Sequence, residues 1–353
     1  MNYKLLILIC LILIYIYIIL KKHNNTLKSI KEHLNFTDDY MKKSYKTTGI
    51  TLNTNEMSLE KCNNNTTKKC KKIHYLYNSN PLSAREICNH KAITNQTLTG
   101  HNIPVSGFFL LRHQDKQTPL AILEIELKRK PLKYPLVIKP IDGTHGTNVI
   151  IGIKNKTELI NELNKLFKLT DAIIIEEQLT GKDYRVLVIN DDVVDIVERE
   201  VITIIGNGTS TIQELIQKRN EKQKTNGTYP THNLDWKLIA EQTGGLDGTG
   251  ILKPNQTIII SNVRNFHNGA NINRLDLSTV HPDNIALFRA VNKAIGLNVG
   301  GIDYMGSDIT KSYKDTDGRI IEVNSAPGLD LHVNPKDNLS QHMGERVVLQ
   351  LFQ

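Results

Sequence analysis

Two apolar segments near the C-terminus each carry oxygen-bearing side chains, and they constrain the fold more than any other feature of this sequence. Asp303 lies in the first segment, and Glu322 and Asn324 lie two residues apart in the second. Residues two apart in a strand point to the same face, so Glu322 and Asn324 share a face if this segment is a strand, and Asp303 can meet them from a neighbouring strand. Two carboxylates and an amide oxygen on one surface suit Mg2+. An antiparallel hairpin with its polar residues in water explains the same pattern equally well.

The composition is that of a globular protein. The 353 residues are 39% hydrophobic and 23% charged, enough for one large or two ordinary domains. The net charge of +8 is spread without a long Lys/Arg run, so no nucleic-acid partner is expected. By charge alone, the basic surface fits an anionic ligand such as a nucleotide about as well as it fits a membrane or nucleic acid. Cys62, Cys70 and Cys88 are widely spaced with no CxxC pair, which predicts neither a zinc site nor a disulfide framework.

The N-terminus contains an unbroken apolar run, Leu5–Leu20. As a helix it is about 24 Å long, slightly short of a hydrocarbon core of about 30 Å, and the flanking Lys4 and Lys21 can reach the two interfaces. A cleaved signal peptide is the competing interpretation, but no A-x-A-like site follows and the positive charge lies mainly behind the run. The sequence therefore predicts a transmembrane anchor at 1–22, a polar tether at 23–72 and a domain at 73–353 on the cytoplasmic side.

The pattern of the remaining chain alternates hairpins with helices, which favours an α+β fold over a doubly wound parallel sheet. Strands are predicted at 134–140, 149–153, 172–177, 184–189, 193–201 and 257–263, with Asp317-Gly318 as the turn between the two metal-site strands. Helices are predicted from a capped start at Ser83, with Ile87, Ile93 and Leu98 in the core, over 120–130, from Thr157, with Leu159, Leu163 and Leu166 on one face, and over 282–295. Thr211 and Glu214 form a capping box before a further helix.

Two segments offer further nucleotide-binding chemistry. Lys139 ends a predicted buried strand just before the Gly-rich loop 142–147, an arrangement that can cradle phosphates, although a lysine at a strand end is also often only an exit to solvent. The strand end Glu176–Leu179 can offer backbone groups to an adenine edge, and Asp183 can hold ribose hydroxyls; an exposed strand end with solvated acids is an equal alternative. The order of these segments and the metal-site strands forms a nucleotide-binding set without a Walker, GxGxxG or kinase motif.

Six stretches in this order resemble an ATP-grasp carboxylate–amine ligase, most closely the ATP-grasp domain of cyanophycin synthetase and its glutathione-synthesising relatives. They are VIKPIDGTHGTNV (137–149), EEQLTGKDYRVLVIN (176–190), VEREVITIIGNGTSTIQELI (197–216), VHPDN (280–284), GLNVGGIDY (296–304) and IIEVNSAPG (320–328). The resemblance implies an ATP-grasp fold of two α+β subdomains that grip ATP. The expected parts are 73–135, a lid subdomain at 136–188 and a metal-binding subdomain at 189–353.

The resemblance also implies residue roles. ATP would be held by Lys139, by Gly143, His145 and Gly146 of the covering loop, by Glu176, Glu177 and Leu179 at adenine, and by Asp183 at ribose. Arg185 and Arg199 would lie near the phosphates or the acceptor. Mg2+, or Mn2+ in its place, would be bound by Asp303, Glu322 and Asn324.

At two places the sequence departs from the family pattern. The family's second ATP-binding lysine corresponds to Asn95, with Lys91 one turn earlier as a substitute. The acceptor signature falls at Arg264 and Asn265, shifted from the family's arginine. The resemblance implies formation of a peptide or amide bond between amino-acid or peptide substrates; a catalytically impaired nucleotide-binding scaffold is the alternative. The membrane is expected as a partner through Leu5–Leu20, and a homo-oligomer is a further expectation.

Overall fold

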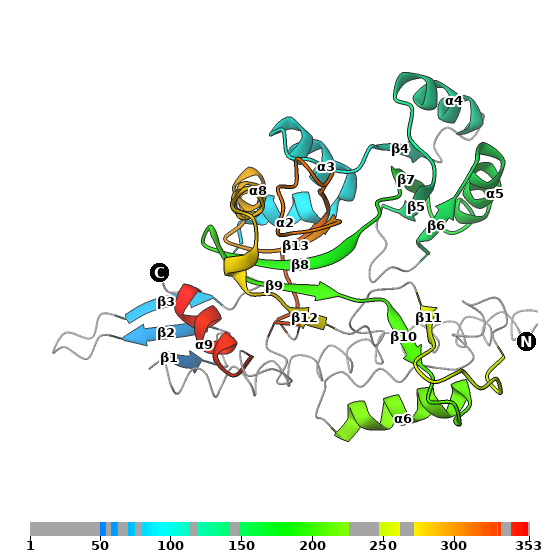
Figure 1. The fold of residues 1–353 in the computed structure, drawn as a ribbon. Helices are drawn as coiled ribbons and strands as arrows, with labels where there is room; N and C mark the ends of the chain where they lie inside the picture. The colour runs from blue at the N-terminus through cyan, green and yellow to red at the C-terminus, as the bar shows by residue number, and fades with distance from the viewer. Residues whose placement is uncertain are drawn as a thin grey trace, which may run out of the picture.

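The structure is a computed structural model that describes residues 50–53, 58–62, 70–74, 80–112, 119–141, 148–225, 247–261, 272–329, 331–332 and 340–351. Within these residues the strands pair antiparallel in four sheets, and helices pack on the larger ones (Figure 1). The predicted α+β class is therefore confirmed. The predicted anchor Leu5–Leu20, the covering loop 142–147 and the acceptor residues Arg264 and Asn265 lie outside the described residues.

The largest sheet has five strands in the order β12-β9-β8-β13-β14. Its strands are β8 (Lys182–Ile189), β9 (Asp192–Arg199), β12 (Ile272–Arg274), β13 (Val299–Gly306) and β14 (Arg319–Asn324). β8 and β9 form a tight hairpin, because Asn190 and Asp191 both adopt positive φ angles, of 48° and 64°, in the connecting turn. β8 begins two residues earlier and β9 ends two residues earlier than the sequence predicts.

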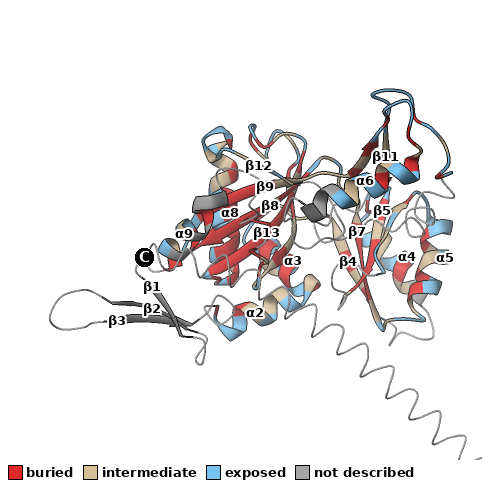
Figure 2. Cartoon of the chain, turned by 90° about the horizontal axis from the view of Figure 1, so that it is seen from below, coloured by how far each residue is buried: buried red, intermediate tan, exposed pale blue. Residues whose placement is uncertain are grey.

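One face of this sheet packs against three helices: α2 (Leu82–Asn89), α3 (Lys91–Gly100) and α8 (Pro282–Ile295). Tyr184 and Tyr304, from neighbouring strands, are buried on this face, and the Tyr304 ring meets the Phe288 ring of α8 edge-on at 5.1 Å between centroids. Side chains alternate along a strand, so the residues directly before and after each of these tyrosines point to the opposite face of the sheet. Figure 2 shows the central strands as largely buried.

A second sheet has four strands in the order β4-β7-β5-β6. Its strands are β4 (Phe108–Arg112), β5 (Leu136–Pro140), β6 (Ile150–Ile153) and β7 (Ala172–Glu177), and α4 (Pro119–Arg129) and α5 (Lys156–Leu166) pack on it. Asn155 caps α5 by accepting a hydrogen bond from the Glu158 amide, and Leu159, Leu163 and Leu166 are buried, which confirms the predicted apolar face of this helix.

The remaining described elements form smaller units. β10 (Ile202–Ile205) and β11 (Thr257–Ser261) pair beside α6 (Ile212–Thr225), whose predicted capping box is confirmed by reciprocal hydrogen bonds between Thr211 and Glu214. β1 (Ile50–Asn53), β2 (Ser58–Cys62) and β3 (Cys70–His74) form a three-stranded sheet. The short helix η4 (Leu277–Thr279) and the C-terminal helix α9 (Ser340–Leu351) complete the described elements.

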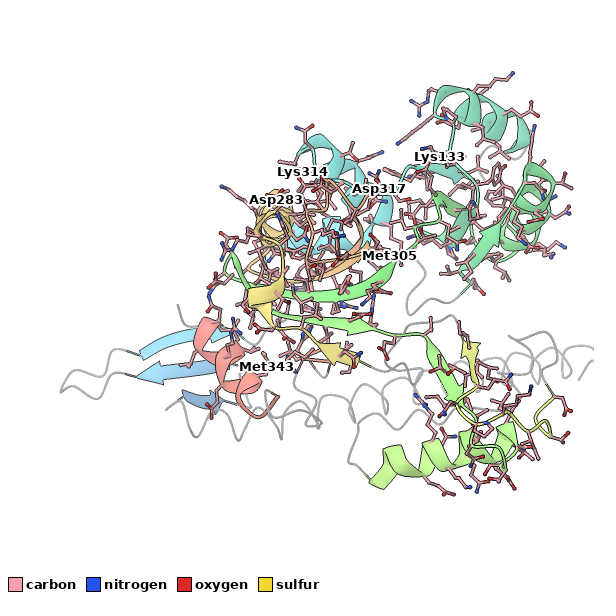
Figure 3. The ribbon with its side chains drawn as sticks, in the orientation of Figure 1. Lys133, Asp283, Met305, Lys314, Asp317 and Met343 are labelled. Atoms are coloured by element: carbon pink, nitrogen blue, oxygen red, sulfur yellow. The ribbon has the colours of Figure 1, made fainter. Side chains whose placement is uncertain are left out.

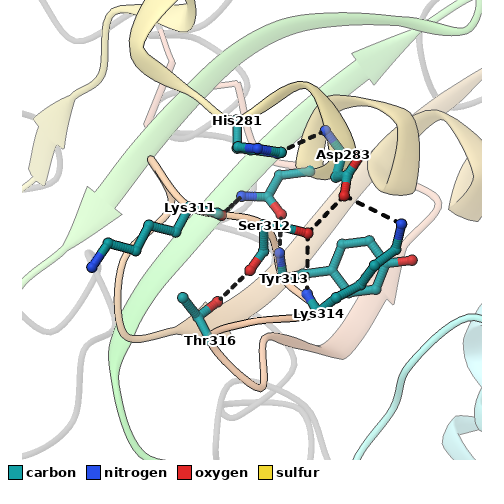
Figure 4. Close-up of polar contacts among 8 residues, drawn as sticks. His281, Asp283, Lys311, Ser312, Tyr313, Lys314 and Thr316 are labelled. Carbon is teal, nitrogen blue, oxygen red and sulfur yellow. Dashed lines mark hydrogen bonds and ion pairs between the residues drawn. The ribbon is translucent and has the colours of Figure 1, made fainter.

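The connection between β13 and β14 is longer than the predicted two-residue turn. It spans residues 307–318, and Asp317 takes the positive φ of 50° at its end. The start of α8 holds it in place: Asp283 accepts hydrogen bonds from Ser312 at 2.7 Å and pairs with Lys314 at 3.2 Å (Figure 4). Figure 3 shows Asp283 and Lys314 together over this connection. The turn prediction was wrong because these contacts join residues about 30 positions apart.

The first predicted helix is also different in detail. Pro81 rather than Ser83 stands at the N-cap, and no side chain caps it. The chain extends at His90 and begins a second helix at Lys91, which turns Ile93 outward to 45% exposure while Leu98 stays buried. Ile93 was therefore wrongly assigned to the core. Among the described helices, none is long and apolar enough to cross a membrane.

Candidate functional site

The three predicted metal-site residues lie on one face of the five-stranded sheet. Asp303 is the register partner of Glu322 on β14 and of Arg185 on β8, and Asn324 lies opposite Gly301. A bulge between Asp303 and Tyr304 makes two β14 residues oppose one of β13, so Ile320 turns into the helix-covered core while Glu322 stays on the other face. We call this other face, opposite the helices, the site face.

Two arginines occupy the site face beside Asp303. The Nε of Arg185 lies 2.7 Å from Oδ1 of Asp303, and Nη2 of Arg199 lies 3.3 Å from its Oδ2. Arg199 also donates from Nε and Nη2 to Oδ1 of Asp183, at 3.0 and 2.6 Å. Burial by itself lowers the pKa of Arg199, but attraction to Asp303 and Asp183 more than offsets it, so the pKa of the guanidinium is raised. Two fixed positive charges therefore stand beside the carboxylates.

The second sheet contributes a buried ion pair. Lys139 of β5 and Glu176 of β7 lie diagonally across adjacent strands, with Nζ and Oε2 2.6 Å apart and side chains only 10% and 7% exposed. Asn95 of α3 donates to the other carboxylate oxygen of Glu176 at 3.1 Å. Burial alone lowers the pKa of Lys139, but attraction to Glu176, and then to Glu322 and Asp303, reverses this and raises it. Lys139 is therefore a lysine that stays charged.

Charged side chains from the two sheets come close together around Glu322. Lys139 is near enough to Glu322 and Asp303 for both carboxylates to raise its pKa, and Lys91 of α3 places Nζ 3.7 Å from Oε1 of Glu322. The structure therefore brings together Lys91, Lys139, Arg185, Arg199 and the carboxylates that the sequence selected, from α3, β5, β8, β9, β13 and β14.

The donor set fits a divalent cation. Asp303 and Glu322 are paired across adjacent strands, and Asn324 follows Glu322 on the same face, opposite Gly301. Magnesium usually takes one or two protein carboxylates and fills its other positions with water and substrate phosphates, so two carboxylates and an amide suffice. The described residues contain no cluster of three or more His, Cys, Asp or Glu side chains that could form an all-protein cage.

Glu177 and Asp183 make contacts within the protein, and the nucleotide roles of Glu177, Leu179 and Asp183 stay predictions. The Glu177 side chain accepts from the Lys133 amide at 2.9 Å, while its backbone N–H donates to Gly107 and its carbonyl accepts from Ser106. The carboxylate of Asp183 is held by Arg199. Leu179 follows the end of β7 and is half-buried.

Sequence reasoning missed the role of Asn95 and a buried group on the site face. Asn95 stands out in the sequence only as the residue in place of a lysine, yet it is a partner of Glu176. Asp195, Arg274 and His332 form a second buried charged cluster on the site face. An acidic residue inside the otherwise apolar run of β9 was the available signal for Asp195.

The chain is similar in sequence to one known family model and to several curated proteins. A family model described as RimK-like ATP-grasp domain matches residues 88–203, which include Lys91, Lys139, Glu176, Arg185 and Arg199. Cyanophycin synthetase from Geminocystis herdmanii is 33% identical over 287 residues, which are 78% of this chain and 32% of that protein. The glutathione biosynthesis bifunctional protein of Clostridium perfringens is 30% identical over 225 residues, 62% of this chain and 29% of that protein.

The chain spans about a third of the length of the curated relatives it matches. Among solved structures, a bifunctional glutathione synthetase from Pasteurella multocida aligns over 86% of this chain and 42% of its own, with a TM-score of 0.57 and 19% identity. At that identity the likeness supports the fold. Residues 88–203 therefore match the RimK-like ATP-grasp family model, and the expected ATP-grasp α+β fold is confirmed.

Proposed function

We propose that this ATP-grasp chain is an ATP-dependent carboxylate–amine ligase that forms a peptide or amide bond through an acylphosphate. The observation that carries the proposal is that Asp303, Glu322, Arg185 and Arg199 share one face of the five-stranded sheet, and that Lys139 of the second sheet lies near Asp303 and Glu322. The paired carboxylates suit the metal ion, and the fixed cations beside them suit the negative charge of the phosphates. Together they suit a metal-bound triphosphate.

In the proposed reaction, the carboxylate of one substrate attacks the γ-phosphorus of ATP, so that a C–O–P bond forms and ADP leaves. The amine of the second substrate then attacks the acyl carbon, loses a proton and displaces inorganic phosphate. A divalent cation held by Asp303, Glu322 and Asn324 would supply charge neutralisation on the nucleotide phosphates.

The chain's own cations have separate tasks in this scheme. Lys139 is buried and held by Glu176, so it presents a fixed charge to the phosphates with little reorganisation. Arg185 and Arg199 stabilise the charge that develops on the transferred phosphoryl group or on the acyl carboxylate. The ion pair of Arg185 with Asp303 and the hydrogen bonds of Arg199 to Asp183 fix their directions. Gly143, His145 and Gly146 stay predicted members of a loop that excludes water, and Arg264 and Asn265 stay predicted acceptor residues.

The substrates proposed are amino acids or peptides. The names of the relatives support this, because glutathione is a peptide and the matched proteins are a cyanophycin synthetase and a glutathione biosynthesis protein. Tethering to a membrane through Leu5–Leu20, with the domain on the cytoplasmic side, is a proposal that rests on the apolar run and its flanking lysines. Membrane fractionation of the full chain against a variant without residues 1–22 tests it; equal partition of both would contradict it.

The central experiment measures ADP formation by the full chain with ATP, Mg2+ and a panel of amino acids and small peptides. We expect ADP release that needs both the metal and an acceptor, and that Glu322→Ala abolishes. Glu124→Ala removes a carboxylate from the exposed pair with Lys156 and is the matched control, with unchanged turnover. Nucleotide binding without ADP release for any acceptor would overturn the ligase and favour a nucleotide-binding scaffold.

A further inference from the structure

The segment that follows β14 crosses the site face of the five-stranded sheet. A β-carbon placed on Gly301 would lie 2.6 Å from Cβ of Pro327, so Pro327 sits directly over β13. Leu331 packs against Val197 of β9 and Ile272 of β12. Since the strand order is β12-β9-β8-β13-β14, residues 325–329 and 331–332 lie across the sheet from one side to the other. We call residues 325–329 and 331–332 the crossing segment.

A buried charged cluster fastens the far end of the crossing segment. Nδ1 of His332 lies 2.7 Å from Oδ2 of Asp195, and Arg274 forms an ion pair with the same carboxylate oxygen. Arg274 also donates from Nη2 to the His332 carbonyl at 2.7 Å. His332 is completely buried and Asp195 is 2% exposed. The end of the segment is therefore tied to β9 through its side chain and to β12 through its backbone.

This cluster shares the sheet face with the candidate site. Asp195 lies opposite Leu187, and Arg199 lies opposite Asp183, so both residues of β9 point to the site face, about 13 Å apart along the strand. Arg274 lies opposite Val197, between them. At its near end the crossing segment begins directly after Asn324, and in its middle Pro327 lies over Gly301, beside Arg185.

Stability alone is a poor reason for such a cluster. Burying ions costs several kcal/mol each, and apolar residues of similar volume commonly give equal or greater stability. In addition, Nε2 of His332 is buried without a hydrogen-bond partner among the described residues, which is uncommon for a group whose only task is packing. The cluster does fix the position of His332, because Asp195 is hydrogen-bonded to its ring and Arg274 is hydrogen-bonded to its backbone carbonyl.

We propose that His332, Asp195 and Arg274 are positioning residues: they hold the crossing segment taut over the sheet, so that Asn324 keeps its place beside Glu322 and Asp303. The inference rests on the proposed metal-nucleotide site. It assigns the cluster no contact with the substrate. Release of the far end lets the segment shift as a unit, and the first group to move at the other end is the amide of Asn324.

The test compares nucleotide binding with and without metal. Affinity for a fluorescent ATP analogue is measured on the full chain in Mg2+ and in EDTA. His332→Gln shifts the amide toward the Nε2 position and loses the bond to Asp195, so the gain in affinity on adding Mg2+ should fall roughly tenfold, as for other residues that orient metal ligands. Binding in EDTA should be unchanged.

A conservative variant separates positioning from packing. His332→Asn places its amide nitrogen near the Nδ1 position and keeps a donor for Asp195, so it should retain most of the Mg2+-dependent gain. Arg289→Met breaks an exposed ion pair with Asp192 on the same strand, β9, and is the control without effect. If His332→Gln does not fold, Arg274→Lys, which keeps the charge but loses the forked geometry, carries the same expectation.

The outcomes are distinguishable. An unchanged Mg2+-dependent gain in folded His332→Gln overturns the inference, and so do equal losses in His332→Gln and His332→Asn. A wild-type chain that binds Mg2+-nucleotide but makes no ADP overturns the ligase proposal and leaves the positioning role intact. A wild-type chain that binds no Mg2+-nucleotide overturns both.

Discussion

The two faces of the five-stranded sheet are built from the same strands, yet the charged side chains of the candidate site lie on only one of them. Tyr184, Val186, Ile302 and Tyr304 belong to the core under α2, α3 and α8, whereas their neighbours Asp183, Arg185 and Asp303 face the other side. Each strand therefore contributes to folding and to the site at alternate positions. Burial on the apolar face therefore offsets the cost of concentrating charge on the site face, and a substitution can damage one face without the other.

The largest effect is expected on the packed face. Tyr304→Ala removes a fully buried ring that packs against Phe288 and Tyr184, and should lower the free energy of unfolding by about 3–5 kcal/mol. Denaturant unfolding measures it. Tyr313→Ala, at a partly buried ring beside the same core, is the control and should cost less than half as much; equal losses would contradict the division into faces.

On the site face, Asp303→Asn should affect turnover more than folding. It keeps the size of the side chain but removes the charge shared by Arg185 and Arg199, and so should reduce the rate of ADP formation at least 100-fold, about 2.7 kcal/mol in transition-state free energy. Initial rates and thermal unfolding are measured on the same preparation. Loss of cooperative folding in Asp303→Asn would show that the two faces are not separable.

Gly301→Ala tests the contact between β13 and the crossing segment. Its β-carbon would lie 2.6 Å from Pro327 and 2.9 Å from Nη1 of Arg185, so either the segment or the arginine must move. We expect a stability loss of about 1–3 kcal/mol together with weaker Mg2+-nucleotide binding. Gly100→Ala is the control, because nothing lies within 4 Å of its β-carbon; the idea fails if both variants behave alike.

The smallest effect concerns the pH dependence of the Lys139–Glu176 pair. The pKa of Lys139 is raised on folding, so its stabilising contribution is complete below its unfolded pKa of about 10.5 and is lost only as pH rises through the higher folded value. The difference in unfolding free energy between wild type and Lys139→Met should therefore stay constant from pH 7 to about pH 10. Lys156→Met, in an exposed pair, is the control. A difference that declines below pH 9 would contradict this assignment.

The parts of the fold that are local in sequence could be predicted. The apolar spacing of α5, the capping box of α6 and the bounds of α8 each depend on residues within a few positions of one another. The shared face of Glu322 and Asn324 follows from strand periodicity alone, and the bulge before Tyr304 leaves it intact.

The parts that depend on distant residues could not be predicted. Glu176 is the partner of Lys139 because β5 and β7 are adjacent, and no local pattern gives that adjacency. His332 reaches Asp195 across 137 positions, and the connection 307–318 is fixed by the start of α8. Ile93 has the periodicity of a core residue, but the break at His90 rotates the second helix and turns this side chain outward.

The position of Asp303 between Arg185 and Arg199 has a consequence for ion selection. Any cation that approaches this carboxylate must compete with two guanidinium groups that are already in place. Because the attraction to Asp303 and Glu322 scales with the charge of the ion, we expect sodium and potassium to compete poorly with the two arginines. A doubly charged ion that arrives with a triphosphate gives the displaced arginines new anionic partners. We therefore expect the nucleotide-free protein to bind sodium and potassium weakly at this site, and to bind the divalent metal chiefly together with nucleotide.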